Sequence, residues 1–166
     1  MMRFIATFGY SGLLKPAPGT WGSAAAVLVA LGVDLIGGVI ALAIGVLALF
    51  ALGLEATKAM TQTGDHDPSW IVIDEVVGQW IALFPVAYLA GQLGGGLINY
   101  PFLVIIAFAL FRLFDIWKPG LIGQADQRGD AAGVMLDDVW AGVYAACGTT
   151  LVIVAMIYFY AGATTP

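Results

Sequence analysis

Long apolar runs, with charged residues only near one end, dominate the hydropathy pattern of the chain. A membrane-spanning helix needs about 20 apolar residues, because the hydrocarbon core is ~30 Å thick and a helix rises ~1.5 Å per residue. Four runs meet this requirement: Leu35 to Leu54, Ile71 to Leu93, Ile98 to Trp117 and Val134 to Tyr160. A shorter run, Trp21 to Val33, fits either a short span or a re-entrant segment. The pattern predicts an all-α, polytopic membrane bundle with four or five membrane segments.

The composition supports a membrane protein. Of the 166 residues, 61% are hydrophobic and 10% are charged, against about 25% charged in ordinary soluble domains, and the mean hydropathy is +0.95. We expect one domain over residues 1–166 and no cleaved signal peptide. The net charge of −5 argues against a nucleic-acid partner. The single cysteine, Cys147, excludes an internal disulfide and a Cys-rich metal site.

The basic residues predict the orientation of the chain. Gly37-Gly38 and Gly94 to Gly96 sit in or beside turns. If the N-terminus is cytoplasmic and five spans follow, all six basic residues lie inside, as the positive-inside rule requires. They are Arg3, Lys15, Lys58, Arg112, Lys118 and Arg128. Among the acids, only Asp34 then falls on the outer side. We therefore expect a multi-pass protein of the bacterial inner membrane.

Five acidic residues near the ends of spans are the main candidates for chemistry. They are Asp74, Glu75, Asp115, Asp137 and Asp138, and the predicted topology brings them to one membrane face. Ionisable residues inside spans are costly and are functional by default. Carboxylates that converge in a low-dielectric site must take up protons or bind a cation, and Mg²⁺ prefers oxygen ligands. The alternative is that the acids pair with Arg112 and Lys118 and only lock the bundle together.

Helical geometry separates these acids. Glu75 shares a face with Gly78, Gln79 and Ala82, and Asp138 shares one with Gly142 and Ala145. Because small residues let helices approach closely, both faces suit the bundle interior. We therefore favour Glu75 and Asp138 as metal ligands, with Asp74 and Asp137 as further candidates. Asp115 stands three residues after Arg112, which also suits an ion pair.

Two other segments offer polar groups for a site. Thr20 and Ser23 open an apolar helix after Gly19, so the helix N-terminus can bind an anion or is simply capped. His66 stands beside Asp67 and can act as a general acid or base, although a lone loop histidine is more often only solvated. The run Asp65-His66-Asp67 is similar to the nucleophile motif of haloacid dehalogenase-type phosphatases. That motif needs a parallel sheet, which the pattern does not predict.

Four segments taken together resemble the phosphatidylglycerophosphatase A family, the Mg²⁺-dependent phosphatases of bacterial phospholipid synthesis. The segments are Pro18 to Ser23, His66-Asp67 with Ile71 to Trp80, Phe111 to Pro119, and Gly133 to Gly142. The resemblance extends from about Gly12 to Gly142. It implies an all-helical fold, an inner-membrane location, and conversion of phosphatidylglycerophosphate to phosphatidylglycerol and phosphate.

The resemblance also implies which residues form the site. The motif positions are Thr20, Ser23, His66, Asp67, Asp74, Glu75, Arg112, Asp115, Lys118, Asp137 and Asp138. The chain departs from the family twice. Gly120 follows Pro119 where the family usually has Lys-Pro-x-Pro. Gln127 precedes Arg128, and Asp130-Ala-Ala132 replaces a pair of glycines, so the role of Arg128 stays open.

The sequence therefore predicts a Mg²⁺-dependent phosphatase that acts on a phospholipid within the bilayer. The phosphomonoester would lie between the metal, Arg112 and Lys118, with Thr20 and Ser23 nearby, and a carboxylate or His66 would handle the proton. Attack by water and covalent attack by an aspartate both stay open, as do the number of metal ions and the oligomeric state.

Three rival classes fit the sequence less well. A transporter predicts charges near the bilayer centre, whereas these lie at the ends of spans. A CDP-alcohol phosphotransferase requires the run Asp-x-x-Asp-Gly-x-x-Ala-Arg, which the sequence lacks. A purely structural membrane subunit would tolerate replacement of the five acids.

Overall fold

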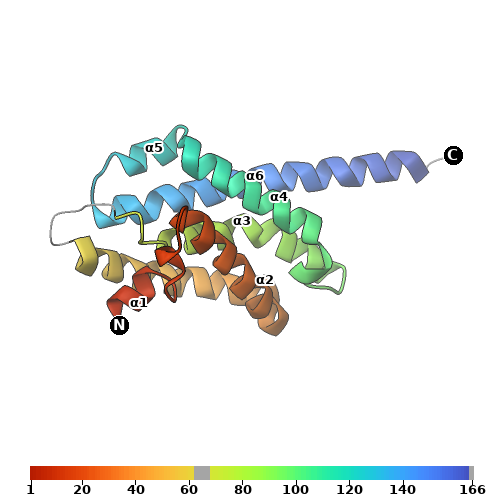
Figure 1. Cartoon of the computed structure of the whole chain (residues 1–166). Helices are drawn as coiled ribbons and strands as arrows, with labels where there is room; N and C mark the ends of the chain where they lie inside the picture. The colour runs from red at the N-terminus through yellow and green to blue at the C-terminus, as the bar shows by residue number, and fades with distance from the viewer. Residues whose placement is uncertain (62–67, 165–166) are drawn as a thin grey trace.

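The computed structural model describes residues 1–61 and 68–164, and this part of the chain is helical with no strand (Figure 1). The all-α prediction is thus confirmed for the described residues. The elements in chain order are α1 (Met2–Ala6), the 3₁₀ turn η1 (Ser11–Leu13), α2 (Pro18–Thr61), α3 (Ile73–Gln92), the 3₁₀ turn η2 (Leu97–Asn99), α4 (Pro101–Trp117), α5 (Leu121–Asp126) and α6 (Ala131–Thr164).

Helix α2 folds back on itself at the predicted Gly37-Gly38 turn. Gly38 has φ 58° and ψ −150°, a conformation that is essentially restricted to glycine. The two arms then run side by side against α3. Gly22 of the first arm lies against Val72, and Gly53 of the second lies against Ile73. Residues 18–36 and 39–61 therefore form a hairpin, and the first arm is helical from Pro18 onward.

Helix α3 is the centre of the bundle. It packs against α2, α4 and α6, and its apolar residues are buried on nearly all sides, including Val76, Val77 and Leu83 at 0% exposure. Trp80 lies between the two arms of α2: its indole N–H donates to the carbonyl of Ala26 at 2.9 Å, and its ring lies against Gly45. The central helix therefore fixes the spacing of the α2 hairpin.

Helices α3 and α6 cross with their backbones in contact. A Cβ on Gly78 would lie 2.4 Å from the carbonyl oxygen of Asp138, and one on Gly142 would lie 2.4 Å from the carbonyl oxygen of Gly78. Glu75 and Asp138 each stand about one turn before these glycines. The small-residue faces expected from the sequence thus meet, and the crossing brings the two acids together.

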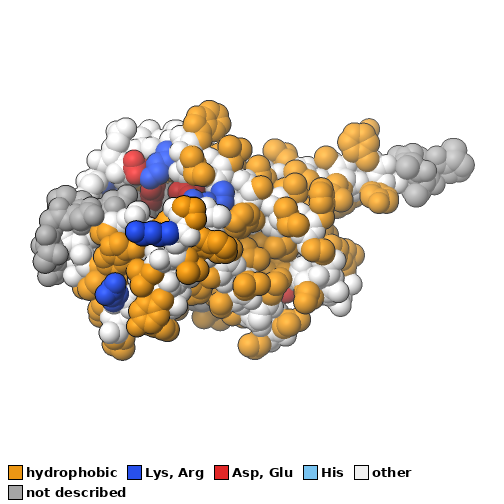
Figure 2. Space-filling model, in the orientation of Figure 1, with side chains coloured by type: hydrophobic (Ala, Val, Ile, Leu, Met, Phe, Trp, Pro, Cys, Tyr) orange, Lys and Arg blue, Asp and Glu red, His pale blue; other side chains and the backbone are white. Residues whose placement is uncertain are grey.

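The two ends of the bundle differ in charge. At the turn between α3 and α4, the buried Asp34 accepts a hydrogen bond from the N–H of Leu97 at 2.7 Å. The remaining described acids and the basic residues lie toward the other end, and Figure 2 shows acidic and basic atoms gathered there on an otherwise hydrophobic face.

Within the described residues, three helices are long and apolar enough to cross a membrane: α2, α3 and α6. Helix α4 has 17 residues, somewhat fewer than the ~20 of a typical span, and α2 contains the hairpin. Many large apolar side chains are exposed on these helices, for example Ile36 at 87% and Phe159 at 74%. These features are those of a membrane protein, while the expected count of four or five segments stays a prediction.

Candidate active site

A pocket of about 360 Å³ opens where the starts of α2, α3 and α6 meet the end of α4. We call it the acidic pocket. Its charged lining residues are Asp74, Glu75, Arg112, Asp115, Lys118, Asp137 and Asp138. The structure thus brings together all five acids and both cations that the sequence singled out, from three different helices and the residue that follows α4.

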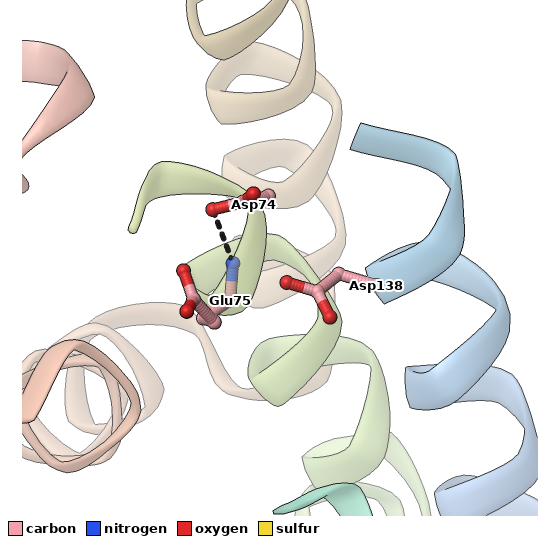
Figure 3. Close-up of side chains that lie close together, drawn as sticks. All are labelled: Asp74, Glu75 and Asp138. Carbon is pink, nitrogen blue, oxygen red and sulfur yellow. Dashed lines mark hydrogen bonds between the residues drawn. The ribbon is translucent and has the colours of Figure 1, made fainter. Parts of the chain in front are cut away.

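Three of these acids form a tight cluster. Asp74, Glu75 and Asp138 each offer an oxygen, and these oxygens lie within 4.8 Å of one another (Figure 3). Asp74 and Asp138 are 7% and 3% exposed. The N–H of Glu75 donates to Asp74 Oδ1 at 3.0 Å, whereas Glu75 Oε2 and Asp138 Oδ1 are buried without a hydrogen bond. None of the ion pairs in the described part of the chain involves this three-carboxylate cluster.

The other two acids are paired with cations, as the alternative interpretation of the sequence predicts. Arg112 Nη1 lies 2.6 Å from Asp115 Oδ2. Lys118 Nζ lies 2.8 Å from Asp137 Oδ2 and also binds Asp126. The ion-pair alternative therefore holds for Asp115 and Asp137 but not for the three-carboxylate cluster. Asp137 also accepts the N–H of Asp138 at 2.9 Å, which ties it to that cluster.

Lys118 stays protonated in this position. Burial alone would lower the pKa of the ammonium group, but hydrogen bonds to Asp126 and Asp137 outweigh burial and raise the pKa above its usual range. Lys118 ends α4 in the left-handed conformation, with φ 50°, so the chain turns there. This cation is thus held at the pocket between two carboxylates.

The start of α2 forms one wall of the acidic pocket. Gly19 and Thr20 line it, and a Cβ on Gly19 would lie 2.3 Å from Glu75 Oε1 and 3.2 Å from the guanidinium of Arg112. Glycine at this position leaves room for the side-chain ends of Glu75 and Arg112 to approach the backbone. The free N–H groups and positive dipole end of the first turn are suited to an anion.

The predicted phosphate-binding residues occupy different places. Thr20 is exposed and lines the acidic pocket. Ser23 is fully buried and donates from Oγ to the carbonyl of Gly19 at 2.8 Å, while Arg112 Nη1 lies 3.4 Å from Ser23 Oγ. Ser23 therefore supports Arg112 from behind the pocket wall.

Sequence reasoning missed two polar residues near the site. Ser69 lines the acidic pocket just before α3, and Asp126 of α5 binds Lys118. Asp126 lies eight residues after Lys118 across a helix end, so no helical spacing signalled the contact. His66 and Asp67 lie outside the described residues, so the predicted acid–base role of His66 stays a prediction.

The donor chemistry of the acidic pocket fits a hard divalent cation. Five carboxylates face two cations, which leaves an excess of three negative charges if all are ionised. A phosphomonoester would add further negative charge and be repelled by the cluster. Mg²⁺ prefers oxygen ligands. Asp74, Glu75 and Asp138 supply carboxylate oxygens, two of which are buried without a hydrogen bond, so these three residues fit such an ion.

Comparison with known proteins gives consistent matches. The family model described as phosphatidylglycerophosphatase A matches residues 4–153. A phosphatidylglycerophosphatase A of Haemophilus influenzae is 39% identical over 153 residues, which cover 90% of this chain and 84% of that protein.

Two further relatives match shorter parts. A putative phosphatidylinositol-3-phosphatase of Bacteroides thetaiotaomicron is 41% identical over 102 residues, or 61% of this chain and 58% of that protein. A phosphatidylglycerophosphatase A of Escherichia coli is 36% identical over 84 residues, or 50% of this chain and 43% of that protein. No solved structure matches the chain.

Proposed function

This chain belongs to the phosphatidylglycerophosphatase A family, and on that premise we propose that it hydrolyses the phosphomonoester of phosphatidylglycerophosphate to phosphatidylglycerol and phosphate. The observation that carries the proposal is the acidic pocket, where two cations and a helix N-terminus surround three unpaired carboxylates at one end of an apolar bundle. Such a pocket suits a charged phosphate whose lipid tails remain in the bilayer.

Mg²⁺ is the proposed cofactor, with Asp74, Glu75 and Asp138 as the residues that would hold it. Their oxygens already lie close together, and two of them are buried without a hydrogen bond. A bound divalent cation would polarise the phosphoryl group and lower the pKa of a bound water. Asp137 lies next to this set but is paired with Lys118.

The residues around the cluster orient the phosphate. Arg112 and Lys118 line the acidic pocket and can donate charge-assisted hydrogen bonds to phosphate oxygens. Asp115 and Ser23 hold Arg112 from two sides, so its guanidinium is positioned before substrate arrives. The backbone at Gly19 and the hydroxyl of Thr20 complete the anion-binding wall. A carboxylate of the pocket or His66 accepts the proton of the attacking group.

The proposed location is the bacterial inner membrane, with several spans and the acidic pocket at the cytoplasmic face. The positions of the charged residues support this orientation. Lys58 at the end of α2, Lys118 after α4 and Arg128 before α6 belong to helix ends on the side of the pocket. An excess of Lys and Arg is typical of cytoplasmic segments.

Phosphate release from the purified protein in detergent tests the proposal. We expect release from phosphatidylglycerophosphate with Mg²⁺ and its loss with EDTA, restored by added Mg²⁺. Activity that is unchanged by EDTA would exclude the metal role, and absent activity would exclude the enzyme assignment. Phosphatidylinositol 3-phosphate serves as a second substrate, because one relative is named for it; faster release from it would exclude the proposed substrate preference.

A further inference from the structure

An apolar groove of about 310 Å³ lies between the first arm of α2 and α4. It is lined by Ala24, Val27, Leu28, Val104, Ile105 and Phe108. We propose that this apolar groove binds an acyl chain of the phospholipid substrate and so aligns its headgroup in the acidic pocket. The inference rests on the proposed function and extends it to the substrate's hydrocarbon part.

The apolar groove begins one helical turn beyond the acidic pocket on both of its walls. On α2, Thr20 lines the pocket and Ala24 lines the groove. On α4, Arg112 lines the pocket and Phe108 lines the groove. Residues four apart share a helix face and lie ~6 Å apart along the axis. The two hollows therefore follow one another along the same pair of helices.

The directions of the two helices show that the order of the two hollows matches the order of groups in a phospholipid. Helix α2 starts at the acidic pocket, and α4 ends there. From that end the lining changes from charged residues to aliphatic ones, and the groove reaches Leu28, ~12 Å from Thr20 along the axis. A phospholipid changes from charged to apolar in the same order.

The groove is open to the surrounding lipid. Val104 on its floor is 8% exposed, whereas Leu28 and Ile105 on its rim are 70% and 62% exposed. A lipid chain can thus enter sideways, without passing through the protein interior. Because the bilayer is as apolar as the groove, transfer of the chain yields little hydrophobic gain. The contribution of the groove is to hold the chain in one register relative to Thr20 and Arg112.

Two other apolar hollows lack this relation to the acidic pocket. One is lined by Leu93 and Tyr100 near the opposite turn of the bundle. Another lies between α1 and α2, is lined by the fully buried Ile73, and shares no lining residue with the acidic pocket. Neither continues from the headgroup site along the same helix faces.

Filling the groove tests the inference. Ala24→Phe places a ring where the chain would lie, and Ala155→Phe places the same ring on an exposed position of α6 that lines neither the groove nor the acidic pocket. We expect Ala24→Phe to lower kcat/KM for dioleoyl phosphatidylglycerophosphate by about tenfold or more. The kcat/KM for the dihexanoyl analogue, whose chains barely reach the groove, should stay within about twofold of the wild-type value. Ala155→Phe should leave kcat/KM within about twofold of wild type for both substrates.

A second measurement needs no variant. A phosphatidylglycerophosphate analogue with a photoreactive diazirine on one acyl chain is crosslinked to the wild-type protein, and the labelled peptides are identified by mass spectrometry. We expect labels within residues 24–28 and 104–108. Labels confined to residues 4–9 and 49–52, or spread over all exposed apolar positions, would overturn the inference even if Ala24→Phe fails to fold.

The outcomes separate the groove from the proposed function. If the wild-type protein releases phosphate from neither chain length, the proposed function fails. If the wild-type protein is active and a folded Ala24→Phe hydrolyses the dioleoyl substrate as well as the wild type does, the groove assignment fails while the function stands. If a folded Ala24→Phe protein loses kcat/KM equally for both substrates, the proposed role of the groove in binding the acyl chain also fails.

Discussion

The acids of the pocket differ in their partners, although neighbouring pairs look alike in the sequence. Asp137 accepts a hydrogen bond from Lys118. Asp138, the next residue, has a buried oxygen without a hydrogen bond and points toward Glu75 (Figure 3). Asp115 is held by Arg112. Removing an unpaired carboxylate and removing a paired one should therefore have different consequences for activity and for stability.

Replacing the carboxylates of the cluster by amides should abolish turnover without unfolding the protein. We expect Glu75→Gln and Asp138→Asn each to lower kcat by roughly 10²-fold or more, beyond the ~10–100-fold loss typical of residues that only support metal ligands. In EDTA their Tm should equal or exceed that of the wild type, because the amides remove mutual repulsion. Glu55→Gln changes an exposed glutamate paired with Lys58 and should stay near wild type in both assays. Wild-type turnover in either site variant would contradict the assignment.

Lys118 should contribute mainly to substrate binding. Lys118→Met removes a charged donor at the acidic pocket and leaves Asp137 without its cation, so we expect KM to rise by roughly tenfold or more. Lys118→Arg keeps the positive charge, so its KM should rise less than that of Lys118→Met. Asp126→Asn serves as the control, because Asp137 still holds the lysine. Equal KM values for the methionine variant and the wild type would show that Lys118 does not contact the phosphate.

At the scale of the elements, the crossing of α3 and α6 determines the geometry of the site. The backbone contact of Gly78 with Asp138 lets the two helices approach more closely than larger side chains permit. Glu75 lies one turn from this crossing, and Asp138 is part of it. The distance between the helices at this point should therefore control both stability and activity.

Gly78→Ala tests this control. The added Cβ would lie 2.4 Å from a backbone oxygen that cannot rotate away, so we expect a loss of about 1–3 kcal/mol in unfolding free energy and a marked fall in kcat. Gly91→Ala in the same helix meets nothing within 4 Å and should be neutral or slightly stabilising, since alanine favours helix. Thermal unfolding and phosphate release measure both effects. A fully active, stable Gly78→Ala protein would show that the close crossing is unnecessary.

The start of α6 offers a second test at this scale. Asp130 Oδ1 accepts the N–H of Gly133 at 2.6 Å, and Arg128 binds the same carboxylate. Its hydrogen bond with Arg128 lowers the pKa of Asp130, and the N–H of Gly133 lowers it further. The charged cap is thus present above the unfolded pKa and is lost as the pH falls through the folded value.

Asp130→Ala should therefore lower Tm by roughly 2–4 °C at neutral pH, and the difference from wild type should shrink in acid. Asp130→Asn retains an oxygen acceptor and is the matched control. An alanine variant as stable as the asparagine variant would contradict the capping role.

For the molecule as a whole, the described charges and the apolar surface divide the bundle into a polar end and a lipid-facing body (Figure 2). If the polar end is cytoplasmic, Gln127 between α5 and α6 lies inside and Gln92 at the end of α3 lies outside. Both residues are exposed, so each can carry a reporter cysteine.

A membrane-impermeant maleimide should label Gln92→Cys in cells whose outer membrane is permeabilised, and Gln127→Cys only after the inner membrane is opened. The native Cys147 is exposed on α6 and is first replaced by serine. The two variants act as controls for each other. The reverse pattern would place the acidic pocket outside, and labelling of both in intact cells would exclude the proposed span between them.

The sequence alone determined the helical, membrane character, the Gly37-Gly38 turn and the identity of the pocket's acids. Each follows from local properties: the length of an apolar run, the freedom of glycine, and the cost of a charge within a span. Helix periodicity also identified the faces that carry Glu75 and Asp138, because the spacing of small residues is visible in the chain.

Only the tertiary structure decided how the acids divide between ion pairs and the unpaired cluster. Asp74 and Asp137 looked equivalent, but Asp137 meets Lys118, whose place depends on the turn after α4. The contact of Asp126 with Lys118 and the groove beside Ala24 and Phe108 likewise arise where separate helices meet. Sequence periodicity describes the faces of one helix, whereas partners across helices are set by packing distances that no single segment contains.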